Sequence, residues 1–401
     1  MRNPISATRR EVISASLGIA AVLPADAENA NSYRPVLTPA DKFVDVSRGA
    51  PIPHSLRGEK QVDAGLTPQT WQLEILGEGT TKVAIPLTRA SGNALDYRAL
   101  LALGDAGHVT FIKVMQCLNI EEPLGQGLWE GVPLRTVLGL VGQCSNVRRV
   151  YYSGFHNNEA SQLFQSSLSL TDALESPPGC PPACLVYRLN GQPLPPERGG
   201  PVRMVIPWAH GFKSIKWLNK ITLTNEFRAN DTYADANNDP ESHLKTAAYL
   251  NDIPEKVTVG IDLTLRGVVV CGLSGLARVE CWLRPITTRQ APVTPQSSEW
   301  QHANWRTATI QPAPTHWNSE LPPGTDVSAV YGFRKSKRSP TIWPMPYTMA
   351  SWSFHIGKIP PGTYEIRARA VDLNGFAQPE PRPDRQTGLN PVQVARFVVV
   401  T

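Results

Sequence analysis

The sequence predicts an α+β domain followed by an all-β sandwich. Up to about residue 228, short strand patterns alternate with short helical ones. A polar, turn-rich segment follows at 228–243, and the chain then continues as strands at short spacing with Gly/Pro turns. That second pattern is typical of an immunoglobulin-type sandwich. We therefore expect domains at 31–235 and 250–401, in a chain whose 37 prolines and 30 glycines fit a turn-rich globular protein.

Local patterns justify the elements of the first domain in chain order. Residues 31–65 are rich in proline and are expected to wrap a surface without regular structure. Apolar or β-branched runs predict strands at 70–77, 81–88, 108–117, 147–155, 184–194, 202–208 and 215–224. The 184–194 run contains Asn190-Gly191, which predicts a hairpin. Helical spacing and terminal signals predict helices at 96–104, 133–142 and 168–176, the last capped by Thr171.

The second domain is predicted from its strand content. Apolar, β-branched runs separated by Gly and Pro occur at 256–272, 276–285, 350–372 and 392–400. We find no solenoid-like repeat in the chain.

The N-terminus predicts export. Arg9 and Arg10 precede a short, modestly apolar stretch and then small residues, so 1–30 is interpreted as a twin-arginine signal. A disordered or mitochondrial-like leader is the alternative. We expect a periplasmic protein without a membrane span, because no run reaches roughly 18 apolar residues.

Charge narrows the choice of partners. The net charge of +5 and pI near 8.9 come without any Lys/Arg-rich run, so no nucleic-acid partner is expected. A mild positive excess suits an anionic substrate or cofactor.

The six cysteines leave several possibilities open. None lies in a Cys-x-x-Cys-His motif, so no haem is predicted in this chain. In an exported protein Cys180 could pair with Cys184, or Cys271 with Cys281. Cys117, which ends the run "VMQC", could be a buried small hydrophobe, half of a disulfide or a soft-metal ligand.

A longer stretch favours the ligand. The sequence "VYRLNGQPLPPERGGPVRMVIPWAHGFKSIKWLNKITLT" at 186–224 resembles the sulfite oxidase family of molybdopterin-dependent oxidoreductases. Its "IPWAHGFKSIKW" part is also similar to related bacterial methionine-sulfoxide reductase subunits. The upstream segments "LTPQTWQLEILG" and "LWEGVPLRTVL" follow the family's order, and the C-terminal strands resemble its immunoglobulin-like dimerisation domain. The resemblance implies a mixed α/β molybdopterin-binding domain followed by that all-β sandwich.

The resemblance also implies a site. Cys117 matches the thiolate ligand of the molybdenum, and a soft thiolate suits that metal. Tyr187 matches an active-site tyrosine, whose phenol can hydrogen-bond a ligand of the metal. Arg57 lies roughly where the family places a substrate-contacting arginine.

Four further cations are implied to hold the anionic cofactor. Arg203 matches the arginine of the Pro-Val-Arg strand, and Lys216 the lysine before the tryptophan; Lys213 is a weaker candidate. Arg198 stands where many members have histidine. A planar guanidinium suits phosphate and pterin recognition because it donates in a fixed fork.

One departure affects the substrate. Where the family has two arginines after its cysteine, this chain has Glu121 and Glu122. Two carboxylates near the pocket would oppose a dianion, unless they lie on the outer side of the turn. His156 could line the funnel to the site, although a surface loop is the expected position.

The predicted function is that of an exported molybdenum–molybdopterin oxidoreductase acting on sulfite or a related sulfur compound. The resemblance implies oxygen-atom transfer, an external electron acceptor such as a cytochrome c, and a homodimer. One alternative is a sulfoxide or N-oxide reductase using the same cofactor. The other is a cofactor-free secreted binding or scaffold protein.

Overall fold

The computed structural model describes residues 34–117, 120, 122–177, 179–229, 242–287, 293–378 and 391–401. Residues 35–401 form one compact unit. No helix in the described ranges has the length and apolar character needed to cross a membrane. The predicted export signal and most of the predicted linker lie outside the described residues.

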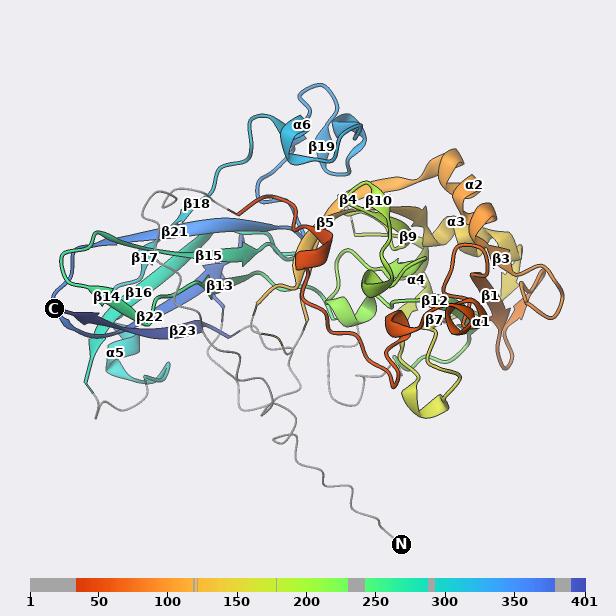
Figure 1. Ribbon diagram of the computed structural model, residues 1–401, viewed down its shortest axis with the longest axis horizontal. Coiled ribbons are helices and arrows are strands. Elements are labelled where there is room, and N and C mark those ends of the chain that lie inside the picture. Colours follow the sequence, from red (N-terminus) through yellow and green to blue (C-terminus); the bar gives the residue numbers. More distant parts are fainter. Residues whose placement is uncertain are drawn as a thin grey trace, which may run out of the picture. The chain divides into compact units, whose positions relative to one another are not determined.

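Two sheets form the first half of this unit (Figure 1). The first has the order β3-β1-β12-β7-β8, in which β1 and β12 run parallel and the other pairs antiparallel. The second has the order β10-β9-β5-β4, with β11 added to β9. The strands of the first sheet are β1 (Gln72–Gly77), β3 (Leu95–Asp96), β7 (Arg149–Gly154), β8 (Gln165–Ser169) and β12 (Leu218–Thr224). Those of the second are β4 (Val109–Met115), β5 (Gly125–Pro133), β9 (Cys184–Leu189), β10 (Gln192–Pro193) and β11 (Arg203–Val205).

Short helices accompany these sheets. They are α1 (Glu59–Asp63), α2 (Tyr97–Gly107), α3 (Leu134–Leu138) and α4 (Leu170–Leu174). The carboxylate of Asp96 accepts a hydrogen bond from the amide of Ala99 and so begins α2, as an N-cap does. Helix α4 is capped by Ser169, whose hydroxyl accepts from the Asp172 amide. The predicted cap at Thr171 is therefore wrong, because Thr171 already lies inside the helix.

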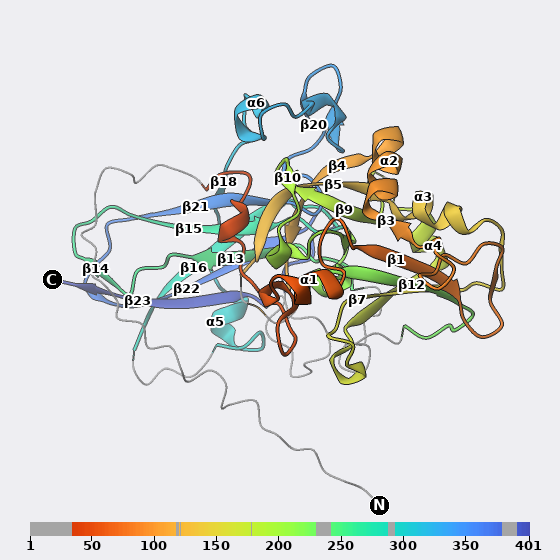
Figure 2. The ribbon, with the colours of Figure 1, turned by 45° about the vertical axis from the view of Figure 1, so that its right-hand side comes forward.

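The second half of the unit consists of two sheets that share one apolar core (Figures 1 and 2). Their orders are β13-β15-β21-β18 and β14-β23-β22-β16-β17. Trp352 and Phe354 from one sheet meet Ile366 and Phe397 from the other in this core. The strands are β13 (Ala247–Asn251), β14 (Lys256–Thr258), β15 (Leu263–Val270), β16 (Arg278–Ile286), β17 (Arg306–Thr307), β18 (Thr309–Ile310), β21 (Met349–Gly357), β22 (Gly362–Val371) and β23 (Gln393–Val400).

The remaining elements are short. Two-stranded pairs and single-turn helices are β2 (Lys82–Val83) with β6 (Cys144–Ser145), β19 (Phe333–Arg334) with β20 (Ser339–Pro340), α5 (Ser298–Gln301) and α6 (Trp317–Glu320).

The predicted fold class is confirmed: mixed helices and strands precede a β-rich part. The hairpin after β9 forms at Asn190 and Gly191, both with positive φ. The strand predicted at 81–88 is reduced to β2, because the backbone beyond it pairs only in isolated bonds. None of the six cysteines, all of which lie in the described part of the chain, forms a disulfide, so neither possible pairing occurs.

Candidate functional site

The loop after β4 carries Cys117. The side-chain amide of Gln116 donates to the carbonyls of Cys117, at 2.8 Å, and Ile120, at 2.9 Å. The Gly211 amide donates to the Gln116 carbonyl at 2.7 Å, and the Val114 amide to that of Tyr347 at 2.8 Å. The half-buried Cys117 is thus positioned by hydrogen bonds of Val114 and Gln116 before it and of Ile120 after it.

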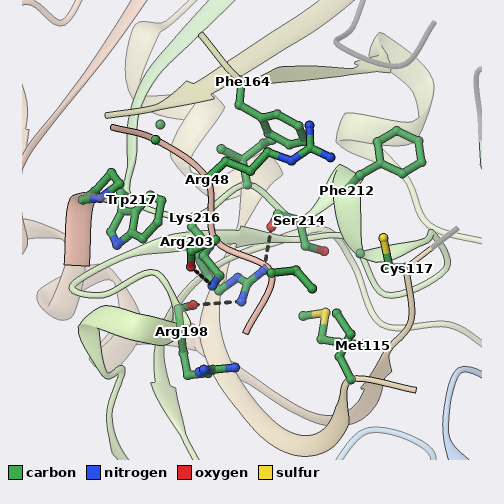
Figure 3. A pocket seen from close by; sticks show the side chains of 18 of the residues that line it. Arg48, Met115, Cys117, Phe164, Arg198, Arg203, Phe212, Ser214, Lys216 and Trp217 are labelled. Carbon is green, nitrogen blue, oxygen red and sulfur yellow. Dashed lines mark hydrogen bonds between the residues drawn. The ribbon is translucent and has the colours of Figure 1, made fainter. Parts of the chain in front are cut away.

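Cys117 lines a cavity of about 240 Å³. Four of the described lining residues are cations and none is acidic. Figure 3 shows Cys117 and Phe212 on one side, and Lys216 with Trp217 on the other. The lining residues are Phe43, Val44, Val46, Ser47, Arg48, Gly49, Pro53, Met115, Cys117, Ile120, Leu124, Gly154, Phe155, His156, Gln162, Phe164, Arg198, Arg203, Gly211, Phe212, Ser214, Ile215, Lys216 and Trp217.

Arg203, on β11, is the most deeply buried of these cations, with 5% of its surface exposed. Its guanidinium donates to the carbonyls of Arg198, at 2.8 Å, and Ser214, at 2.6 Å (Figure 3). It also lies over the Trp129 ring. Burial, with the neighbouring Arg198 charge, lowers the pKa of Arg203 to about 9. Its Nε has no hydrogen-bond partner among the described atoms. A buried donor left without a partner is costly, which suggests that a ligand supplies the acceptor.

Arg198, in the single helical turn Pro196–Arg198 before β11, is also a buried arginine with an unsatisfied Nε. It is 7% exposed, donates to the Val44 carbonyl at 3.2 Å and stacks over Phe43. Burial lowers its pKa, against the opposing effect of Asp45 and Glu197. Its Nε is also unsatisfied in the described part of the chain. Two arginines that line one cavity therefore each keep a buried Nε without a partner among the described atoms.

Lys216 differs because it is already engaged. Its ammonium contacts Asp45 at 2.9 Å, Ser47 at 2.5 Å and the Glu197 carbonyl at 2.6 Å. Burial and the charge of Arg203 lower the pKa of Lys216 to about 8, although Asp45 acts in the opposite direction. The pKa of Asp45 is held well below its usual range: burial raises it, but bonds from Ser47 and Lys216 lower it more.

A further cation lies behind the cavity. Lys113, on β4, is fully buried and donates to the carbonyls of Pro207, at 2.9 Å, and Ala209, at 3.0 Å. Burial, then the Arg203 charge, lower the pKa of Lys113 to about 7. The site is thus a concentration of positive charge on which two described carboxylates act, those of Asp45 and Glu197, and it favours a ligand with several negative charges.

Three residues predicted for the site are not brought to the cavity. The fully buried Lys213 donates to the Ser167 carbonyl at 2.9 Å. The exposed Arg57 donates to the carbonyls of His54 and Leu56. Tyr187 belongs to the core on the other side of β9.

The Tyr187 hydroxyl has a different environment from the one predicted. It faces α2, where a Cβ at Gly104 would overlap it, and it hydrogen-bonds the Glu130 carboxylate. Burial, and then the charge of Glu130, raise the pKa of Tyr187. This side chain anchors a helix to the sheet.

Sequence reasoning missed Arg48. Arg48 lines the cavity with its guanidinium 5.4 Å from the centre of the Phe164 ring (Figure 3). No motif in "VSRGAPIP" marks it, because its place depends on the path of the wrapping segment past the cavity. His156, for which a surface loop was the expected position and the funnel the alternative, lines the same cavity.

The glutamates after Cys117 are only partly described. Glu122 is exposed and its carboxylate lies 3.4 Å from the Asn251 amide of β13, so it does not line the cavity. Glu121 lies outside the described residues. Because Glu122 does not line the cavity, its carboxylate does not oppose an anionic ligand there.

These residues fit a molybdenum–pterin group. A cysteine thiol at one side of the cavity supplies a soft ligand. The unsatisfied Nε atoms of Arg198 and Arg203 supply donors for its anionic part. The described residues contain no cluster of three or more His, Cys, Asp or Glu that could hold a metal by themselves, so a metal here would need ligands from a cofactor.

Comparisons with known proteins agree with this fit. Residues 59–232 match the family model described as the oxidoreductase molybdopterin binding domain. Mitochondrial sulfite oxidase of Macaca fascicularis is 28% identical over 169 residues, which are 40% of this chain and 30% of the relative. A nitrate reductase [NADPH] of Fusarium oxysporum is 35% identical over 103 residues, 26% of this chain and 11% of the relative. The matches thus span less than a third of these relatives.

A solved structure extends the similarity in fold to nearly the whole chain. The crystal structure of the sulfane dehydrogenase SoxCD from Paracoccus pantotrophus matches with a TM-score of 0.57 and 16% identity. The match covers 95% of this chain and 92% of that one.

Proposed function

The chain belongs, through residues 59–232, to the sulfite oxidase family of molybdopterin oxidoreductases, and from this premise we propose that it binds a molybdenum–molybdopterin cofactor and catalyses oxygen-atom transfer. One observation carries the proposal. Cys117 lines the same cavity as Arg198 and Arg203, two buried arginines that each keep an unsatisfied Nε, and no described acidic side chain lines it.

Each side chain has a role that its position supports. Bound there, the cofactor would supply two-electron redox chemistry with oxygen transfer, which no side chain provides. Cys117 provides the thiolate ligand. Arg198 and Arg203 hold the anionic part of the cofactor through charge-assisted hydrogen bonds. Gln116 fixes the backbone that carries Cys117, so the sulfur is held in place before the cofactor binds.

The substrate is proposed to be sulfite or a related sulfur compound. Arg48 supports this proposal because it places a cation at the cavity near Phe164, where it can attract and orient a small anion. The position of Glu122 outside the cavity supports it as well.

A second candidate is reduction of a neutral S-oxide or N-oxide. The observation that favours it is the aromatic part of the lining: Phe155, Phe164, Phe212 and Trp217. Such surfaces suit apolar organic groups better than they suit a small dianion. Acceptor-linked sulfite oxidation and viologen-linked sulfoxide reduction, measured on one preparation, distinguish the two directions.

Export, dimer formation and electron transfer to a separate protein such as a cytochrome c belong to the same proposal. The paired arginines at 9 and 10 support export by the twin-arginine route to the periplasm. Replacing both by lysine should leave the protein in the cytoplasmic fraction; unchanged periplasmic recovery would contradict this.

Metal and pterin content test the cofactor directly. Protein made in a molybdate-fed host should contain one molybdenum per chain and give pterin fluorescence after oxidation. Protein from a host unable to make the pterin serves as the control. Absence of both signals from the first preparation would leave a cofactor-free binding or scaffold protein.

Replacing Tyr187 by phenylalanine should leave turnover largely unchanged. The lost hydroxyl contacts Glu130 beside α2, so the cost falls on stability, at about 1 kcal/mol for one buried hydrogen bond. Steady-state assays and urea unfolding measure the two effects separately. A hundredfold loss of kcat at unchanged stability would instead place the phenol at the reacting centre.

A further inference from the structure

One wall of the cavity is formed by a segment with no strand or long helix. Seven lining residues come from 43–53: Phe43, Val44, Val46, Ser47, Arg48, Gly49 and Pro53. We call 45–49 the strap. Val44 and Val46 each leave more than a third of their surface exposed, so apolar burial is incomplete in this segment and polar contacts add to what holds it in place.

Both ends of the strap are fixed to the body of the protein. Before it, the Phe43 ring packs on Trp129, and the Val44 amide donates to the Leu124 carbonyl at 2.8 Å. After it, the Ala50 amide donates to the Gln162 side chain at 2.9 Å, and the Asn157 side chain donates to the Pro51 carbonyl at 2.8 Å. These anchors leave 45–49 as the part that can move.

Between the anchors, Lys216 holds the strap. An ammonium has three N–H donors, and here one contacts Asp45, one Ser47 and one the Glu197 carbonyl. Asp45 also accepts from the amide and the hydroxyl of Ser47, so the two strap residues form one compact acceptor for Lys216. With all three donors used, Lys216 has none left for a ligand in this conformation.

The geometry points to the strap as a gate over the cofactor cavity, latched by Asp45 and Ser47 on Lys216. The proposal rests on the proposed function, because it concerns how the cofactor is retained. Arg198 and Arg203, which keep unsatisfied donors, bind the anionic group. The resemblance implied that Lys216 holds the cofactor, but in this structure Lys216 instead closes the cavity wall beside Arg198 and Arg203. Opening the latch exposes the cavity without disturbing Cys117 or its loop.

Hydrogen exchange of the full-length chain tests the latch. Asp45→Asn removes the charge of the acceptor and keeps its shape, and exchange of the 45–49 amides should become about tenfold faster, as expected for losing one charge-assisted bond. Asp41→Asn is the matched control, since Asp41 lies just before the strap and its recorded ion pair is with exposed Lys42. Trypsin should likewise cleave after Arg48 faster in Asp45→Asn than in the wild type or in Asp41→Asn. Equal exchange in all three proteins would overturn the latch.

Cofactor retention gives the second readout. After dialysis, pterin fluorescence should decline several-fold faster in Asp45→Asn and Lys216→Met than in the wild type and in Asp41→Asn. Slower release from Asp45→Asn would show that Asp45 competes with the ligand, and would overturn the gate. A wild-type protein without pterin contradicts the proposed function instead, and the exchange experiment still decides whether Asp45 latches the strap.

Discussion

Replacing Cys117 by serine is expected to abolish turnover. The thiolate is the metal ligand that the chain itself supplies in the proposed site, and a neutral hydroxyl is a harder and much weaker donor to a soft metal. Arg198 and Arg203 remain in place, so the pterin part should still bind. Loss of activity without loss of pterin is the expected pattern.

The fold should tolerate this substitution. Cys117 is only half-buried, and its loop is held through the backbone carbonyls that Gln116 contacts, which serine keeps. We expect the free energy of unfolding to change by less than about 1 kcal/mol, as is usual outside a well-packed core. The matched control is Cys144→Ser, an exposed free cysteine on β6. Full activity in Cys117→Ser would refute the ligand assignment.

The fold could be predicted where a local sequence pattern is compatible with only one local structure. Asn190-Gly191 specified its hairpin because a primed turn needs positive φ at both positions. A helix was predicted at 96–104, and α2 forms there but continues to Gly107, with Asp96 as its N-cap. The strand at 81–88 failed because an apolar run predicts a strand only where a partner strand is available, and β6 offers two residues.

The site was predicted unevenly for a related reason. Cys117, Arg198, Arg203 and Lys216 follow from motif positions, and the structure brings all four to one cavity. Motif position does not specify which face of a strand a side chain occupies. Tyr187 and its neighbour Val186 point to opposite faces of β9, as successive strand residues do, and Tyr187 joins the core with α2.

Arg48 could not be recognised from a motif, because what places it is the path of an irregular segment. The strap is positioned by a few side-chain bonds from distant elements, among them those of Lys216 and Gln162. Such contacts depend on the assembled fold. The proline-rich composition of 31–65 indicates a wrapping segment but not which surface it crosses.

The cofactor-free protein is expected to gain stability as the pH rises from about 7 to about 8.5. Burial lowers the pKa of Lys113 to about 7 and that of Lys216 to about 8, whereas lysines of the unfolded chain titrate near 10.4. In this window the unfolded chain therefore binds more protons than the folded one, and the free energy of unfolding rises with pH. Below the window both lysines are charged in both states, and the cost of burying them is constant.

Other titrating groups set the upper pH limit of this rise in stability. Burial raises the pKa of the thiols of Cys184, Cys271 and Cys281, so above about pH 8.5 the unfolded chain loses protons that the folded one keeps. That opposing effect should flatten and then reverse the trend. Across the window Lys113 alone can contribute up to about 2 kcal/mol, since one pKa unit corresponds to about 1.4 kcal/mol.

Denaturant unfolding at pH 7 and pH 8.5, with and without cofactor, measures this dependence. Lys113→Met should be less stable at both pH values, because two carbonyls lose their donor, but its pH slope should be smaller. A bound anion stabilises the charged lysines and raises their pKa, so the loaded protein should also show a smaller slope. An equal slope in the loaded and cofactor-free proteins would mean that no anion lies close enough to these lysines to shift their pKa, and would contradict an anionic cofactor beside Arg203.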